Sequence, residues 1–224
     1  MHPKKVTYMA GFDNVGTSNH KTIGDFVVSL ISSYTTRYTA GIACYLNPGC
    51  VVLDTKSNTE GFNQRRNNGR QRGKDYVNML KAECVKGADG LVHDTVDIVC
   101  HSMGFAHALG IIDNIRDAMK SDLKGLSFGR LYIIAPENAC SGEVNVNEWQ
   151  EVWQYGADEA NTPLWLQDGV APQCPVGNIG TRRAYIPTSG VPRGFLESHK
   201  IKNYGWIFKL PKTTPNTNGY VTPR

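Results

Sequence analysis

Hydrophobic positions along the chain change their spacing several times, and each change predicts a strand or a helix. Val96, Ile98 and Val99 make a short apolar run with β-branched side chains, which is typical of a buried strand. The apolar positions that follow recur at helical spacing: Ala108, Ile111, Ile112, Ile115 and Met119. The pattern therefore predicts a strand that turns directly into a helix.

Similar patterns predict the other elements. Short apolar runs predict strands over residues 6–10, 131–135, 152–155 and 183–186, and one more within either 42–46 or 51–53. Helical spacing predicts helices over residues 22–34, 76–84 and 201–210. The stretch 55–74 is polar and rich in Asn, Gly and Arg, so it is predicted to be a long loop. Strands that alternate with helices favour a mostly parallel sheet with helices on both faces.

Length and composition are those of one ordinary globular domain. The chain has 224 residues, of which 40% are hydrophobic and 20% charged, so it can bury a substantial core. No repeat or interdomain linker divides it. We expect a single domain over residues 1–210 and, because residues 211–224 are rich in Pro, Thr and Asn, an extended or disordered tail.

Charge and targeting signals indicate whether the chain is a nucleic-acid-binding, membrane-spanning or secreted protein. The net charge of +4 is mild and the acidic residues are spread along the chain, which does not indicate a nucleic-acid-binding protein. No apolar run reaches the roughly 20 residues needed to cross a bilayer, and the first residues lead into a strand instead of a signal-peptide core. The compartment and the oligomeric state stay open.

One dense basic cluster falls within the predicted loop: Arg65, Arg66, Arg70, Arg72 and Lys74. Asn and Gly separate the charges, which favours a solvated loop that leads into a helix. The alternative is contact with an acidic substrate or, at the periphery of a lipid surface, with phospholipid headgroups.

Six cysteines are present, at positions 44, 50, 84, 100, 140 and 174. None has the close pairing of a zinc site, so no metal is expected. Reduced thiols are the favoured interpretation, with Cys84 and Cys100 buried. In an oxidising compartment Cys44 and Cys50 would be able to close a small loop.

Ser102 stands at the turn between the central predicted strand and its helix. Small residues, Cys100 and Gly104, flank it two positions away on each side, and Ala106 allows the helix to lie close to the sheet. In a strand-turn-helix setting this small-x-Ser-x-small pattern is typical of a nucleophile elbow, where a sharp turn strains the serine backbone. The alternative is a serine that only caps a helix.

The segment Val-Asp-Ile-Val-Cys-His-Ser-Met-Gly, residues 96–104, resembles the α/β-hydrolase superfamily and most closely its lipases and esterases. Cys100 stands where the usual motif has its first glycine. The resemblance implies a minimal α/β-hydrolase fold with about six strands, mostly parallel, helices on both faces and no large cap domain.

A serine nucleophile needs a base, and the base needs a group that orients it. The resemblance implies the chain order serine, acid, histidine, and among six histidines only His199 comes late enough. His101 adjoins the nucleophile but leaves the turn in another direction, and His107 is expected to be an ordinary helix residue. The interpretation therefore takes His199 as the general base and acid.

The orienting carboxylate should follow the strand predicted at residues 152–155. Asp158 fits that place best, in a short strand-Gly-x-Asp turn like that of many relatives. Asp168 is the main alternative and Glu159 another, since any of the three is also acceptable as a solvated turn residue.

The oxyanion of a tetrahedral intermediate needs two main-chain N–H donors. The resemblance implies Met103, directly after the nucleophile, as one donor. Phe12, after the first strand and next to Gly11, is the choice for the other, although the His-Gly common in relatives is absent here.

These residues predict a serine ester hydrolase that works through an acyl-enzyme on a small-molecule or lipid ester, with no metal or organic cofactor. The alternatives are a phospholipase or acyltransferase with the same triad, and a non-catalytic binding protein on a hydrolase scaffold. Four residues of the later segments either line an acyl pocket or belong to the core, and we expect at least two in the core: Trp149, Trp153, Trp165 and Leu166.

Overall fold

The computed structural model describes residues 5–10, 51–54, 61–171 and 174–210. The helix predicted at 22–34, the run 42–46 and the tail 211–224 lie outside these residues. The strands are β1 (Lys5–Ala10), β2 (Val51–Asp54), β3 (Thr95–His101), β4 (Ser127–Ile134), β5 (Trp149–Gly156) and β6 (Arg183–Tyr185). The α-helices are α2 (Phe62–Glu83) and α3 (Gly104–Ala118), and the 3₁₀ helices are η2 (Ala139–Ser141), η3 (Val146–Glu148), η4 (Leu164–Leu166) and η5 (Ile201–Lys209).

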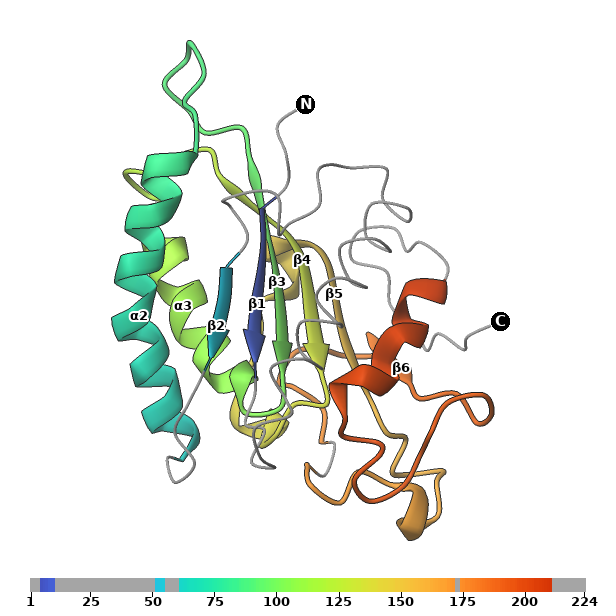
Figure 1. The fold of residues 1–224 in the computed structure, drawn as a ribbon. Coiled ribbons are helices and arrows are strands. Elements are labelled where there is room, and N and C mark those ends of the chain that lie inside the picture. Colours follow the sequence, from blue (N-terminus) through green and yellow to red (C-terminus); the bar gives the residue numbers. More distant parts are fainter. Residues whose placement is uncertain (1–4, 11–50, 55–60, 172–173, 211–224) are drawn as a thin grey trace.

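The strands form a parallel sheet in the order β2-β1-β3-β4-β5-β6. Each neighbouring pair is parallel, and Figure 1 shows the strand arrows pointing the same way. Cys100 of β3 pairs with Met9 of β1 and with Ile133 of β4, so these strands end at one edge of the sheet. The predicted α/β class with a parallel sheet is confirmed, and β2 falls in the second of the two runs that the pattern left open.

Helices α2 and α3 cover one face of the sheet (Figure 1). The apolar face of α3, including Ile111 and Ile115, is fully buried, and each such side chain stabilises the fold by about 1.5–3 kcal/mol. The two helices meet backbone to backbone. A Cβ added at Gly110 would lie 2.0 Å from the carbonyl oxygen of Arg66, and one added at Gly69 would lie 2.1 Å from that of His107.

This contact explains a wrong prediction. The stretch 55–74 was predicted to be a loop, whereas α2 already begins at Phe62. Apart from Phe62, whose ring meets Phe105 edge to face, the first half of α2 binds α3 through glycine backbone and ion pairs. Arg66 and Arg70 lie 3.0 and 2.9 Å from the Asp113 carboxylate, and Arg65 is buried. The basic cluster is therefore part of a helix, and its charges are partly neutralised by α3.

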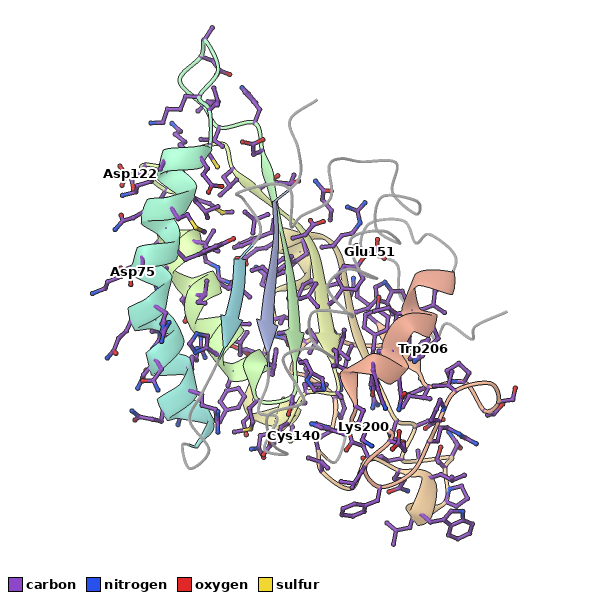
Figure 2. All side chains as sticks on the ribbon, viewed as in Figure 1. Asp75, Asp122, Cys140, Glu151, Lys200 and Trp206 are labelled. Carbon is purple, nitrogen blue, oxygen red and sulfur yellow. A yellow bond between two sulfur atoms is a disulfide. The ribbon has the colours of Figure 1, made fainter. Side chains whose placement is uncertain are left out.

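The other face of the sheet carries a layer of aromatic side chains. Tyr155 stacks on Tyr132 and meets Trp206 of η5 edge to face, and Figure 2 shows Trp206 on this side. The segment predicted as a helix at 201–210 forms this 3₁₀ helix. Trp149 and Trp153 are buried, which confirms that at least two of the four late apolar residues belong to the core.

A disulfide joins Cys140 to Cys174, with 5.5 Å between the Cα atoms. The expectation of reduced cysteines is wrong for this pair, while Cys100 is a buried thiol and Cys84 a half-buried one. Closing a loop across 34 residues stabilises the fold by about 4 kcal/mol in the chain-entropy account. The bond ties η2, after β4, to the segment that follows Asp168.

Candidate active site

Ser102 occupies a sharp turn at the carboxyl end of β3, between that strand and the first residue of α3, Gly104. Its φ is 54°, a backbone conformation that residues with a Cβ rarely adopt. The N–H of Ser102 donates to the carbonyl oxygen of Ile134 at 3.0 Å, which anchors the turn to β4. The side chain is therefore fixed at the end of a strand that has neighbours on both sides.

His199 comes from a loop 97 residues downstream and meets Ser102 at this edge of the sheet. Its Nε2 lies 2.9 Å from Ser102 Oγ, and its Nδ1 lies 2.9 Å from Asp168 Oδ2. A carboxylate only accepts hydrogen bonds, so Nδ1 carries the proton and Nε2 is left to accept from the Ser102 hydroxyl. This is the tautomer that a general base for Ser102 requires.

Asp168 is buried and held by its own turn. Its Oδ1 accepts hydrogen bonds from the N–H groups of Val170 and Ala171, at 3.0 and 2.9 Å, and its Oδ2 faces His199. Both oxygens are thus engaged. The carboxylate has a fixed orientation toward the imidazole.

Among the described hydrogen bonds, none joins His199 to Asp158, the first choice for this carboxylate. Asp158 follows β5 as expected, but its oxygens accept from Asn161 Nδ2 at 3.3 and 3.0 Å. Glu159 lies in the same turn, where its carbonyl oxygen accepts from Gln167. The chain continues past both residues before it returns to His199, which places the alternative, Asp168, beside the imidazole.

Two buried rings hold the main chain on either side of His199. His101 Nε2 donates to the His199 carbonyl oxygen at 2.8 Å, and Tyr204 Oη donates to the Ser198 carbonyl oxygen at 2.7 Å. Burial, with the nearby His199, lowers the pKa of His101 to about 3, so its ring is neutral at pH 7. Sequence reasoning disfavoured His101 as the base, and nothing in the sequence pointed to Tyr204.

A Tyr204→Phe variant tests this support. The ring would still pack, but the Ser198 carbonyl would lose a buried donor, at a cost of about 1–3 kcal/mol. For the ester hydrolysis that the sequence predicts, kcat should fall about tenfold with KM unchanged, because the imidazole is held less firmly against Ser102. A lower melting temperature with kcat intact would show that the hydroxyl serves only folding.

The buried rings of His101 and His107 are expected to lower the free energy of unfolding in acid. Burial also lowers the pKa of His107 to about 4, with Arg72 and Arg65 adding to the shift. Near pH 6.5 the unfolded chain protonates both rings while the fold keeps them neutral, so stability is complete above that pH and lost as the pH falls. We expect each ring to lower the free energy of unfolding by about 2 kcal/mol when the pH falls from 7.5 to 5.

Urea unfolding at the two pH values measures this loss. In a His107→Gln variant the loss should shrink by about 2 kcal/mol, because one of the two rings no longer titrates. An unchanged loss in that variant would contradict the assignment of the effect to His107.

Met103 follows Ser102 and directly precedes α3, where the helix dipole places partial positive charge. Its main-chain N–H is therefore in the position expected for an oxyanion donor. Phe12, the other predicted donor, lies outside the described residues. Within the described part of the chain, no group of three His, Cys, Asp or Glu side chains is arranged to hold a metal ion.

Glu137, in the loop after β4, is a carboxyl that sequence reasoning missed. Burial raises the pKa of Glu137, and His199, Arg65 and Asp168 all act on it electrostatically. The Ser102, His199 and Asp168 array therefore has a second carboxyl in its electrostatic surroundings.

Comparison with family models and with curated proteins gave no match. Among the described helices, none has the length and apolarity to cross a membrane. The assignment of a function thus depends on the geometry of the site.

Proposed function

We propose that this protein is a serine hydrolase that cleaves carboxylic esters through an acyl-enzyme intermediate. One observation carries the proposal: Ser102, His199 and Asp168 form a hydrogen-bonded chain with 2.9 Å at each link. The chain begins at a serine in a strained turn between a central strand and a helix. The three side chains come from distant parts of the sequence and meet in the order hydroxyl, imidazole and carboxylate, which supports a catalytic triad.

The mechanism follows from the hydrogen bonds. His199 Nε2 takes the Ser102 proton while Oγ attacks the ester carbonyl carbon. The Met103 N–H donates to the oxyanion that forms, and Asp168 stabilises the imidazolium. The imidazolium then gives its proton to the leaving alcohol. Water, activated in the same way, releases the acid and restores Ser102.

The fold we propose is a minimal α/β hydrolase over residues 1–210, with about six strands, helices on both faces and no large cap domain. The chain order supports it: the nucleophile follows β3, the acid follows β5 and the histidine follows β6. The proposed chemistry needs no metal or organic cofactor, because each proton transfer is assigned to a side chain of the triad.

Phospholipase or acyltransferase activity would use the same acyl-enzyme with a different ester or acceptor. A non-catalytic scaffold, in contrast, has no need for a carboxylate at the imidazole. The Asp168 contact with His199 weighs against that alternative.

The test is a panel of p-nitrophenyl esters of increasing acyl length, combined with an organophosphate probe. We expect turnover, and one covalent adduct that peptide mass spectrometry places on Ser102. A protein that neither turns over any ester of the panel nor forms the adduct on Ser102 would refute the proposal.

A further inference from the structure

Large apolar side chains are exposed mainly on the two loops that carry Asp168 and His199. The described residues include six large hydrophobic side chains that are exposed, and five of them lie there: Leu164 (77%), Trp165 (73%), Val170 (38%), Phe195 (61%) and Leu196 (54%). We call these five residues the apolar rim. Single exposed apolar residues are ordinary, whereas a concentration of them marks an interaction site.

The rim belongs to one connected surface. The Gly169 N–H donates to the Phe195 carbonyl oxygen at 3.0 Å, and Ser198 Oγ donates to the Leu166 carbonyl oxygen at 3.0 Å. The Phe195 ring lies against Gly169, where an added Cβ would come within 1.9 Å of it. In Figure 1 both orange loops lie beyond the carboxyl ends of the strands.

The rim is joined to the proposed triad by short segments of chain. Asp168 lies between Trp165 and Val170, and the His199 N–H donates to the carbonyl oxygen of Leu196. A partner that covers the rim therefore lies beside the hydrogen bond between His199 and Ser102. A protein bound to the rim would block the access of substrate to Ser102. An assembly of ester molecules bound there would instead provide the substrate.

The charges on the His199 side of the rim favour an anionic assembly, whereas the loop that carries Trp165 also carries two carboxylates, Asp158 and Glu159. The loop around Phe195 and the start of η5 carry Arg193, Lys200 and Lys202 against one carboxylate, Glu197, which pairs with Lys200. Lys200 and Lys202 are exposed, and Figure 2 shows Lys200 at the end of η5 that adjoins this edge of the sheet. Apolar side chains flanked by basic ones are the composition of surfaces that enter lipid headgroups.

We propose that the apolar rim inserts into an anionic lipid surface and that the esters presented to Ser102 are lipids of that surface. The identity of the substrate rests on the proposed function, whereas the docking does not. Docking can therefore be measured with the Ser102→Ala protein, in which no lipid is consumed.

Trp165 provides the signal for this measurement. The chain has four tryptophans, and the other three, Trp149, Trp153 and Trp206, are buried. We expect vesicles of equal parts phosphatidylglycerol and phosphatidylcholine to shift the tryptophan emission to the blue, and brominated acyl chains to quench it. Trp165→Phe should remove the shift while the protein still sediments with the vesicles.

A double variant, Trp165→Ser with Phe195→Ser, should bind these vesicles at least about tenfold more weakly, because two large apolar side chains no longer enter the lipid. The matched control is Val85→Ser, because Val85 is also exposed but follows α2, away from both loops. It should bind like the parent. The protein should bind pure phosphatidylcholine vesicles more weakly than the anionic ones, because the neutral vesicles lack the negative charge that attracts Lys200 and Lys202.

Several outcomes would overturn the proposal. These are no binding by the parent protein, equal binding by the double variant, or equal affinity for neutral and anionic vesicles. A dimer in sedimentation velocity that the double variant abolishes would instead assign the rim to a second copy of the chain. Vesicle binding without ester turnover in the unmodified protein would refute the proposed function and leave the docking in place.

Discussion

Replacing Ser102 with alanine is expected to lower kcat for a p-nitrophenyl ester by on the order of a million-fold and to abolish organophosphate labelling. The substitution removes Oγ, the atom that forms the acyl-enzyme in the proposed mechanism. Among the described residues, no other hydroxyl group is hydrogen-bonded to His199 Nε2. Alanine keeps the small size that the turn requires. The melting temperature of the variant should therefore stay close to that of the parent.

The matched control is Ser121→Ala, an exposed serine after α3, for which we expect unchanged rates and labelling. Residual turnover in Ser102→Ala would come from the oxyanion donors and substrate binding alone, which survive the loss of a nucleophile. Undiminished labelling of Ser102→Ala would show that another residue is the nucleophile, and the proposed mechanism would fail.

The central part of the fold could be predicted because its signals are local. The apolar run before Ser102 and the helical spacing after it correspond to β3 and α3. The strands predicted at 6–10, 131–135, 152–155 and 183–186 are confirmed as β1, β4, β5 and β6. Apolar side chains produce these elements, and apolar side chains are what a periodicity records.

Helix α2 could not be delimited in this way. Its first half contacts α3 through Gly69 and through arginines that pair with Asp113, so the contact leaves no apolar spacing in the sequence. The pair Cys140 and Cys174 is likewise set by the fold, because its partners are 34 residues apart with no recurring spacing.

The site shows the same division between local and tertiary signals. The strand-turn-helix setting of Ser102 and the late position of His199 were enough to select both residues, and the structure brings them together. The choice between Asp158 and Asp168 depends on where a long loop returns. Both follow β5, but Asp168 is aimed by the N–H groups of Val170 and Ala171, a turn whose place in space the sequence does not reveal.

The orienting carboxylate is the proposed role for which the sequence and the geometry favour different residues, so Asp168→Asn is the decisive substitution. The amide that replaces the carboxylate should still accept from the Val170 N–H through its oxygen, but its NH₂ group would face His199 Nδ1. An NH₂ donor stabilises the imidazole tautomer that has its proton on Nε2, where it cannot accept from Ser102. We expect kcat to fall about 10⁴-fold with little change in KM.

Asp158→Asn is the matched control, since the same atoms change on a carboxylate that pairs with Asn161 instead of with His199. Its kcat should stay within about twofold of the parent, because no contact of the Ser102 and His199 pair is altered. If the two effects were exchanged, with Asp158→Asn inactive and Asp168→Asn active, then the working enzyme would have to bring Asp158 to the imidazole by a rearrangement of the loop after β5. Equal and small effects would mean that His199 needs no carboxylate. The triad would then reduce to a serine and histidine pair held by His101 and Tyr204.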